Sequence, residues 1–340
     1  MLHSVRLQGF RCFKLATYNI ASSTVVITGN NGSGKTSLLE GLYYACYLRS
    51  FRTRTPRELV HDASDGFSVE VAGEGGEPWS FTVGFAQGKK RVKRNGATIT
   101  SYQDILDYYR VICIAEQDIN LISGAPEERR SFLDQSIMFL DNNYITLLRR
   151  YRAVLKQRNA LLALPQFDKV SYDIWTDQLE QLSQEIRKHR MELLERLGKH
   201  VSTMLASYSK HPPCISFHYT SKKIPDRILE KERLYKRSLI GAHLDDYTTV
   251  FDKRSSRKFA SRGQQKLVVF LMKIAQKQLF RQDAFFLIDD FMTDFDNIRT
   301  QELLETIHSL SSQVIFTAPH GSGANELLNA TNSLHIDLSL

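Results

Sequence analysis

The segment Gly29-Asn30-Asn31-Gly32-Ser33-Gly34-Lys35-Thr36 constrains this chain more than any other feature. It matches the phosphate-binding loop pattern G-x-x-x-x-G-K-[ST] at every fixed position. Residues 24–28, just before it, are short, apolar and β-branched, which predicts a buried strand. Residues 37–44, just after it, have apolar side chains at helical spacing. Together they predict an α/β unit in which backbone N–H groups and a helix N-terminus face an anion.

The residue types of this loop indicate which anion it binds. In such loops the lysine neutralises the β- and γ-phosphates of a nucleotide, and the hydroxyl that follows ligates Mg²⁺. We therefore expect residues 29–36 to bind ATP, with Lys35 as a catalytic and phosphate-binding residue and Thr36 as a metal ligand. The alternative is a glycine-rich turn that binds nothing, and the predicted strand and helix on either side argue against it.

A second candidate lies where the apolar segment 284–288 ends in Asp289-Asp290. Ligands bind at the carboxyl ends of parallel strands, so two acids directly after a buried strand are placed near a ligand. We expect Asp289 to hold Mg²⁺ and Asp290 to polarise the attacking water, as the acids of phosphate-loop NTPases do. A solvated acidic turn is the alternative interpretation.

Composition limits the class of protein. The 340 residues allow two domains. No apolar run reaches the roughly 18 residues of a membrane span, and the N-terminus lacks the apolar stretch of a secretory signal. The four cysteines form no C-x-x-C pair, which argues against a zinc site or a disulfide framework and suits a cytoplasmic protein. A net charge of +8 favours a polyanionic partner.

Hydrophobic periodicity divides the chain into three parts. Residues 66–100 alternate like β-hairpins, and 111–115 is a buried strand candidate. Residues 127–164 predict one long helix and 175–205 a second, which we expect to pack antiparallel as an arm. Alternating strands and helices then resume. The predicted domains are an N-terminal part of an ATPase head (1–125), a helical arm (126–212) and a C-terminal part of the head (213–340). In the last of these we expect strands at 214–219, 284–288 and 313–317 and helices at 265–279 and 297–310.

Several further segments occur in a characteristic order. Arg49-Ser50-Phe51-Arg52-Thr53, the E-R-R-x-F-L-D segment 128–134 and the G-x-H-x-D-D segment 241–246 are the most specific. With Gly9-Phe10-Arg11, Leu38-Leu39-Glu40 and the motifs above, they resemble the RecF family of bacterial recombination-mediator ATPases, within the ABC and SMC-like superfamily. The resemblance covers nearly the whole chain.

This resemblance implies an α/β fold: a phosphate-loop ABC-type ATPase head with an antiparallel β subdomain, plus an inserted helical arm domain. It implies an ATP-binding protein that forms an ATP-dependent homodimer. Because Asp290 is shorter than the glutamate commonly used at that place, we expect a weak, slow ATPase, and we expect DNA to stimulate it. The resemblance further implies binding to DNA at single-strand gaps, double-stranded DNA or junctions, help in loading recombinase, and RecO- and RecR-type protein partners.

The segment Ser261-Arg262-Gly263-Gln264 gains its meaning from this resemblance. Ser and Gly before a helix are also an ordinary N-cap. In ABC-type ATPases a Ser-x-Gly-Gln segment placed about 25 residues before the acidic strand binds the γ-phosphate held by a second protomer. The resemblance therefore implies that Ser261, Arg262, Gly263 and Gln264 complete the ATP site of a partner copy.

The chain departs from the family pattern at several positions. Arg262 stands where glutamine is usual, and Thr293-Asp294-Phe295-Asp296 replaces Ser-Glu-Leu-Asp. Either change can alter dimerisation. Gln117 either orients water or metal or is a polar residue at a strand end. His320 either acts as the switch histidine of ABC ATPases or is structural.

Five basic residues in six suggest where DNA binds: Lys89, Lys90, Arg91, Lys93 and Arg94. A hairpin with this sequence can follow phosphates, and the alternative is a solvated sheet edge guarded by lysines. Lys253-Arg254 and Arg257-Lys258 add positive charge later in the chain. No side chains look arranged to read bases, so we expect backbone contacts.

Two other functions use the same loop. A small-molecule phosphotransferase would need an acceptor pocket and would give no role to residues 261–264. A nucleotide-gated structural DNA clamp would bind ATP without significant hydrolysis. An ABC transporter ATPase is disfavoured, because the arm and the R-S-F-R-T segment do not fit that branch.

Overall fold

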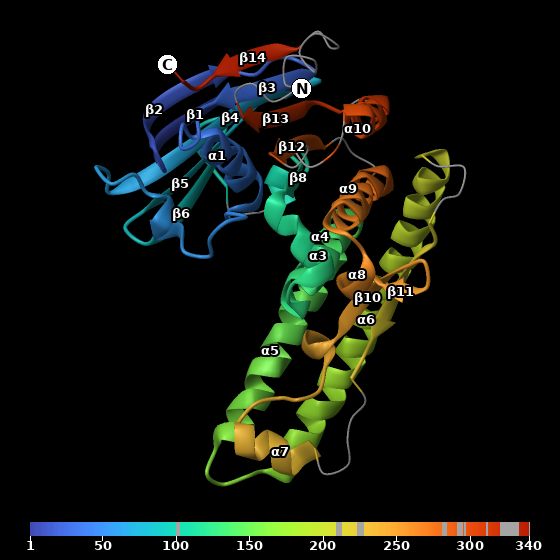
Figure 1. The fold of residues 1–340 in the computed structure, drawn as a ribbon. Helices are drawn as coiled ribbons and strands as arrows, with labels where there is room; N and C mark the ends of the chain where they lie inside the picture. The colour runs from blue at the N-terminus through green and yellow to red at the C-terminus, as the bar shows by residue number, and fades with distance from the viewer. Residues whose placement is uncertain are drawn as a thin grey trace. The chain divides into compact units, whose positions relative to one another are not determined.

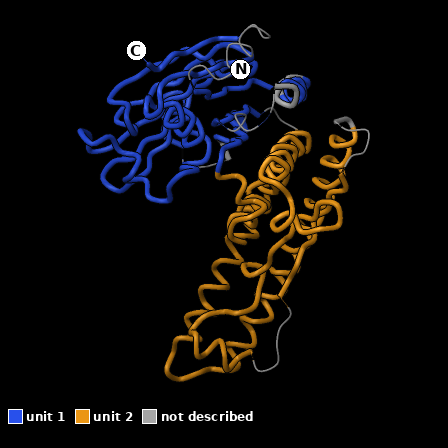
Figure 2. Tube along the Cα trace, in the orientation of Figure 1, with its two compact units in different colours: residues 1–116, 282–340 blue, residues 117–281 orange. Residues whose placement is uncertain are grey.

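The computed structural model describes residues 1–99, 103–208, 213–222, 228–280, 284–290, 295, 297–310, 312–319 and 333–339. The chain folds into two compact units (Figure 2): residues 1–116 with 282–340, and residues 117–281. These units differ from the predicted domains, because residues 213–281 belong with the arm helices and not with the head.

Unit 1 contains a parallel sheet that carries the phosphate loop. Its strand order is β14 (Leu334–Asp337), β3 (Thr24–Gly29), β13 (Val314–Pro319), β12 (Phe285–Asp289) and β8 (Val111–Ala115). All neighbouring strands pair in parallel. β3 and β8 are buried along their whole length, as expected of strands covered on both faces. The strands predicted at 24–28, 111–115, 284–288 and 313–317 are confirmed.

An antiparallel sheet forms the second layer of unit 1. Its order is β2 (Phe13–Asn19), β1 (Leu2–Phe10), β4 (Gly66–Gly75), β5 (Glu77–Ala86), β6 (Lys89–Arg94) and β7 (Ala97–Thr98). Alternate residues of β4 and β5 are buried, so one face of this sheet lies against the core. The hairpins predicted between 66 and 100 are confirmed.

Helix α1 (Lys35–Tyr47) lies between the two sheets of unit 1 (Figure 1). It is buried on nearly all sides, which explains why apolar residues surround the whole helix. Gly41 allows its close approach to β1, because a Cβ there would lie 2.5 Å from Leu7 Cδ2. The Gln313 side chain links the two sheets. Its Oε1 accepts a hydrogen bond from Leu2 N, and its Nε2 donates to the carbonyl oxygens of Leu2, Ile20 and Ser22. The unit also contains η1 (Pro56–Leu59), α2 (Gln103–Leu106) and α10 (Asn297–Ser309).

Unit 2 is built around long helices. α5 (Asn143–Ala163) and α6 (Lys169–Tyr208) pack along each other. Predicted stripe positions such as Leu179, Ile186 and Leu197 are fully buried. The single helix predicted over 127–164 is wrong, because α4 (Pro126–Leu140) ends before α5 begins. The break falls at Asp141, whose carboxylate accepts a hydrogen bond from Asn143 N at 2.9 Å and so competes with helical bonding.

A small antiparallel sheet completes unit 2, in the order β11 (Arg254–Ser255), β10 (Asp246–Phe251) and β9 (Ile215–Thr220). α9 (Arg262–Leu279) follows it and confirms the helix predicted at 265–279. None of the helices within the described ranges is long and apolar enough to cross a membrane. The remaining short elements are η2 (Glu116–Ile119), α3 (Asn120–Ser123), α7 (Ile228–Tyr235), η3 (Ala242–Leu244) and α8 (Ser256–Phe259).

Candidate nucleotide-binding site

The loop between β3 and α1 has a backbone that requires glycine. Gly34 has a φ of 104°, and a Cβ there would lie 2.7 Å from Cys12 Sγ and 2.8 Å from Phe13 Cζ. Gly32 also has a positive φ, of 86°. The buried Ser33 hydroxyl oxygen has no hydrogen-bond partner among the described residues. The glycine conformations let the loop turn around an anion, and Ser33 offers it an unused donor.

Lys35 is buried at the first turn of α1 and faces back into this loop. Its ammonium donates to Gly29 O at 2.9 Å and to Asn30 O at 3.2 Å. Only 5% of the residue is exposed. The side chain is therefore already held over the loop, where its charge can meet a phosphate.

Thr36, in the first turn of α1, lies next to Asp289, the last residue of β12. The Thr36 hydroxyl donates to Asp289 Oδ1 at 2.9 Å, and Thr317 on the intervening strand β13 donates to the same oxygen at 2.9 Å. Burial raises the pKa of Asp289, the two threonine bonds lower it, and the neighbouring Asp290 raises it again. Thr317 was not predicted as a site residue. Its place at the end of the strand beside the acidic one could have indicated it.

Asp290 adopts an unusual backbone conformation directly after β12. Its φ is 46°, in the left-handed region, and its N–H donates to the Thr317 hydroxyl oxygen at 3.0 Å. Aspartate adopts this region more readily than most residues, and such conformations are enriched at functional sites as well as in turns. The turn places a second carboxylate next to Asp289.

Glu40 organises the surroundings of the loop, a role that the sequence analysis missed. This side chain on α1 is completely buried and receives two 2.8 Å bonds from the Arg11 guanidinium. Ser50 also donates to it, and Arg52 lies 3.8 Å from its Oε2. Glu40 thus ties the Gly9-Phe10-Arg11 and R-S-F-R-T segments to the helix that begins at Lys35. A buried acid within a helix of apolar residues was the available signal.

The side chains of Thr36 and Asp289 fit a magnesium ion that binds together with a nucleotide. The hydroxyl of Thr36 and the carboxylate of Asp289 are oxygen ligands on neighbouring elements, and Mg²⁺ is commonly held by one or two such groups plus phosphates and waters. Among the described residues there is no group of three or more His, Cys, Asp or Glu positioned as an independent metal site. Thr36 and Asp289 would thus hold the ion together with nucleotide oxygens and waters.

Residues 261–264 begin α9 in unit 2. Ser261 Oγ accepts from Gln264 N at 3.2 Å, and Gln264 Oε1 accepts from Ser261 N at 2.8 Å. This reciprocal pair is a capping box, so the capping interpretation holds structurally. Ser261, Arg262 and Gln264 are nevertheless exposed, and Gly263 has open space around its Cα. Their predicted role in a partner's ATP site stays a prediction.

The basic residues of β6 divide between two faces. Lys90 and Arg94 turn inward: Lys90 Nζ donates to Leu48 O at 2.6 Å, and the Arg94 guanidinium lies 3.9 Å from the Tyr108 ring centroid. Burial lowers the pKa of Lys90. Lys89, Arg91 and Lys93 are exposed. Lys90 is exposed as well, but its ammonium is engaged by Leu48 O, whereas Lys89, Arg91 and Lys93 project from the opposite face of the strand.

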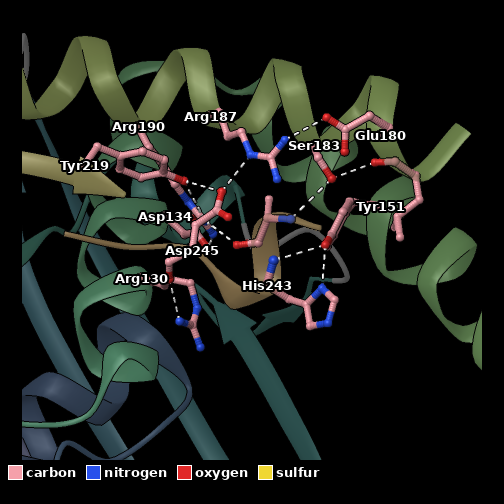
Figure 3. Close-up of polar contacts among 12 residues, drawn as sticks. Arg130, Asp134, Tyr151, Glu180, Ser183, Arg187, Arg190, Tyr219, His243 and Asp245 are labelled. Atoms are coloured by element: carbon pink, nitrogen blue, oxygen red, sulfur yellow. Dashed lines mark hydrogen bonds and ion pairs between the residues drawn. The ribbon is translucent and has the colours of Figure 1, made fainter. Parts of the chain in front are cut away.

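The E-R-R-x-F-L-D segment 128–134 and the G-x-H-x-D-D segment 241–246 contact each other in unit 2 (Figure 3). Arg190 on α6 makes two bonds to Asp134, of 2.8 and 2.9 Å, and also donates to Ala242 O. Arg130 donates to Asp245 O at 2.7 Å, and Tyr219 donates to Asp245 Oδ2 at 2.9 Å. The segments 128–134 and 241–246 thus hold the small sheet against α4 and α6.

One more contact of this network involves His243. Its Nδ1 lies 2.7 Å from the Tyr151 hydroxyl oxygen, and burial lowers its pKa.

Gln117 lies in η2, directly after β8. The positions of His320, Thr293, Asp294 and Asp296 fall outside the described residues, so their roles stay predictions.

Comparison with known proteins gives a consistent relationship. The family described as RecF/RecN/SMC N terminal domain matches residues 1–333. The DNA replication and repair protein RecF of Thermosynechococcus vestitus is 30% identical over 346 residues, covering 94% of this chain and 90% of that protein. The RecF of an Exiguobacterium species is 27% identical over 361 residues, covering 98% and 97%.

Solved structures show the same fold. The recombination mediator protein RecF-ATP in the RecFOR pathway superposes with a TM-score of 0.84 at 24% identity, over 94% of this chain and 92% of that one. An Smc head bound to the C-winged helix domain of ScpA gives 0.55 at 15% identity, over 94% and 90%. The fold is that of an ABC-type ATPase head with an antiparallel subdomain and a helical arm, and the chain belongs to the RecF family of the ABC and SMC-like superfamily.

Proposed function

We propose that this chain is an ATP-dependent DNA-binding protein of recombinational DNA repair and replication. In this proposal an ATP-driven homodimer binds DNA at single-strand gaps or junctions and helps to load recombinase, with slow, DNA-stimulated ATP hydrolysis. RecO- and RecR-type proteins are its proposed partners, and the cytoplasm its location. Membership of the RecF family supports this function, and a similar solved structure is described as RecF-ATP.

One observation carries the proposal: Thr36 and Asp289 come within 2.9 Å of each other beside an intact phosphate loop. Lys35 would neutralise the β- and γ-phosphates, and the loop N–H groups would hold their oxygens. Thr36 and Asp289 would hold Mg²⁺, which neutralises phosphate charge when bound. Asp290 would orient the attacking water.

The second half of the proposed ATP site comes from another copy of the chain. Ser261–Gln264 would present the N-terminus of α9 and its first N–H groups to the γ-phosphate bound by the partner. Each copy would contribute a phosphate loop and one such helix end. ATP would thus be required for the dimer, and the dimer for tight DNA binding.

Light scattering tests this directly. We expect a monomer with ADP, a dimer with Mg²⁺ and ATP, and a dimer–DNA complex when gapped duplex is added. Lys35→Met should weaken ATP-dependent dimerisation and DNA binding together, because both need the phosphates held. A monomer in ATP, or DNA binding that Lys35→Met leaves unchanged, would contradict the proposal.

Asp290→Asn separates an ATPase from a clamp that does not hydrolyse. For an ATPase we expect turnover to be lost and the ATP dimer to persist, since the variant keeps the phosphate loop and Asp289. For a clamp without hydrolysis, wild type and variant would have the same negligible turnover. A phosphorylated small-molecule product would instead indicate a phosphotransferase.

A further inference from the structure

A basic segment joins the small sheet of unit 2 to α9. Residues 253–264 contain five Lys or Arg and no Asp or Glu. Four of the five lie on the β10–β11 turn, β11 and α8, and all four are exposed. We call these four residues, together with the adjacent Phe259, the basic hairpin surface: Lys253, Arg254, Arg257, Lys258 and Phe259.

The basic hairpin surface is held by its backbone. Phe251 pairs with Arg254 across a two-residue turn whose residues, Asp252 and Lys253, have φ values of 47° and 63°. This is the turn geometry that suits a tight hairpin. On the other side, Gln265 Nε2 of α9 donates to Ser256 O and Ala260 O, both at 3.1 Å. The cations therefore project from a supported hairpin and helical turn.

The one acid next to this surface is already engaged. Asp252 Oδ1 accepts from Cys214 N at 2.9 Å, and Asp252 N donates to Cys214 O. Its carboxylate is thereby directed to the start of the neighbouring strand region. The four cations have no ion-pair partner among the described residues within 4.0 Å, so their charge is available to a polyanion.

Phe259 gives the surface a second chemical property. The residue is 64% exposed, although phenylalanine is normally buried. The Arg254 guanidinium lies 5.8 Å from its ring centroid, so a cation borders the ring. Exposed aromatic rings stack on unpaired bases, while neighbouring Lys and Arg follow the phosphates. In a duplex the faces of the bases are stacked on one another and cannot receive the ring, and an acidic protein has no bases.

We propose that the basic hairpin surface binds single-stranded DNA, with Phe259 stacked on a base and Lys253, Arg257 and Lys258 contacting phosphates. This rests on the proposed function and adds to it a place for the unpaired strand of a gapped DNA. Arg262 is not part of the surface, because it belongs to the predicted ATP site.

Fluorescence anisotropy with labelled oligothymidylate and with a blunt duplex, both in Mg²⁺ and ATP, tests the stacking. Phe259→Ala should weaken oligothymidylate binding about five-fold or more and leave duplex binding within about two-fold, the loss expected for one stacked base. Phe259→Tyr keeps an aromatic ring and should bind oligothymidylate like the wild type. Circular dichroism of both variants should be unchanged, since the ring is exposed.

The phosphate contacts are tested by charge. Arg257→Gln with Lys258→Gln should reduce the slope of log affinity against log salt by about 1.4 for oligothymidylate, at about 0.7 per lost contact. The matched control is Lys169→Gln with Lys199→Gln. It removes the same net charge from unit 2, but these lysines already pair with Asp173 and Glu195. The control slope should equal that of the wild type.

The outcomes separate the two proposals. If the wild type with ATP binds neither DNA, the proposed function fails. If it binds DNA but Phe259→Ala binds oligothymidylate normally, or loses both DNAs equally, the single-strand site is overturned while DNA binding stands. If Phe259→Ala loses affinity for polyglutamate and not for oligothymidylate, the surface is a protein-docking site and this inference is wrong.

Discussion

Asp289 is held where its charge is costly to the folded protein. Burial is the main cause of its raised pKa, and the neighbouring Asp290 adds to it. A carboxyl group whose pKa is raised by folding stabilises the fold at pH values below its unfolded pKa. That contribution is lost as the pH rises through the folded pKa. At neutral pH the ionised Asp289 therefore opposes folding, and this is the charge that a bound cation would compensate.

Asp289→Asn should therefore stabilise the protein without ligand while removing its response to Mg²⁺ and ATP. Asparagine keeps an oxygen that can accept from Thr36 and Thr317, but it carries no charge. We expect the melting temperature at pH 7 to rise by about 2 °C or more, the shift of roughly 1 kcal/mol in a protein of this size. The gain should shrink as the pH is lowered through the raised pKa of Asp289, because the protonated carboxyl group carries no charge either.

The matched control is Asp62→Asn, an exposed aspartate in the same unit. Its melting temperature should equal that of the wild type at each pH. A lower melting temperature for Asp289→Asn at pH 7 would contradict the argument, as would full stabilisation of that variant by Mg²⁺ and ATP.

At the scale of single residues, local patterns in the chain led to the predictions for Lys35, Thr36 and Asp289, whose roles stay predictions. Lys35 and Thr36 are fixed by the loop that precedes them, and Asp289 by the strand it ends. Glu40 and Thr317 were missed because their partners lie far away in sequence: Arg11 is 29 residues from Glu40, and Asp289 is 28 residues from Thr317. No local pattern records such a pairing.

The beginning of α9 shows how one element can carry two roles. Ser261 and Gln264 satisfy each other's backbone N–H groups, yet their exposed positions leave the helix end accessible. Substituting an N-cap serine by alanine costs about 1 kcal/mol of stability, whereas aspartate caps as well as serine. Aspartate would nevertheless repel the phosphates that we propose this helix end binds.

Ser261→Asp should therefore keep the stability of the wild type and lose ATP-dependent dimerisation. Ser261→Ala should lose about 1 kcal/mol of stability and dimerise less tightly. Denaturation midpoints and light scattering in Mg²⁺ and ATP measure the two properties separately. If Ser261→Asp dimerises normally, this helix end does not contact phosphate.

Helix α7 is attached to the arm by a buried ion pair. Arg158 on α5 makes two bonds to Glu232, of 2.9 and 2.7 Å, and neither side chain is exposed. Tyr172 donates to Glu232 as well. Removing one member of such a pair leaves a buried charge without its counterion.

Glu232→Gln should destabilise the protein by about 3 kcal/mol, because Arg158 then stays buried without a countercharge. Urea denaturation measures this, and limited proteolysis should cut near α7 sooner than in the wild type. Glu195→Gln removes the acid of the exposed pair with Lys199 and should leave the midpoint unchanged. Equal midpoints for the two variants would show that the buried pair does not anchor α7.

At the scale of elements, periodicity predicted most strands and helices but not their ends or faces. The break at Asp141 depends on a side-chain bond that hydrophobic spacing does not reveal. The five cations of β6 were treated as one surface, although strand alternation already places Lys90 and Arg94 opposite Lys89, Arg91 and Lys93. The inward pair lies on the face that carries Phe81 and Phe85.

For the whole molecule, the chain order hides how the units are assembled. Unit 1 combines both ends of the chain, and Gln313 joins strands that are about 300 residues apart in sequence. The predicted boundary at 212 followed the end of the long helix. It missed that the family motif at 241–246 returns to α4 and α6 through the ion pairs Arg129–Asp246 and Arg187–Asp245. Such long-range ion pairs add to the packing that joins these segments, and they are visible only in the folded chain.

The net charge of +8 belongs to the molecule, but its effect on DNA depends on where the charges point. We expect duplex affinity in Mg²⁺ and ATP to fall steeply with salt, because contacts to phosphates release counterions. Replacing Lys89, Arg91 and Lys93 by glutamine should reduce the slope of log affinity against log salt by about 2.7, at about 0.9 per contact.

The inward residues of the same strand provide the comparison. Lys90→Gln with Arg94→Gln removes contacts to Leu48 O and the Tyr108 ring, so it should lower stability and leave the salt slope unchanged. The second control, Lys169→Gln with Lys199→Gln, lowers the net charge by removing two lysines that already pair with Asp173 and Glu195. It should also keep the slope. If all three variants shift the slope equally, DNA responds to the overall charge and β6 is not its binding face. A wild-type affinity that does not vary with salt would exclude phosphate contacts altogether.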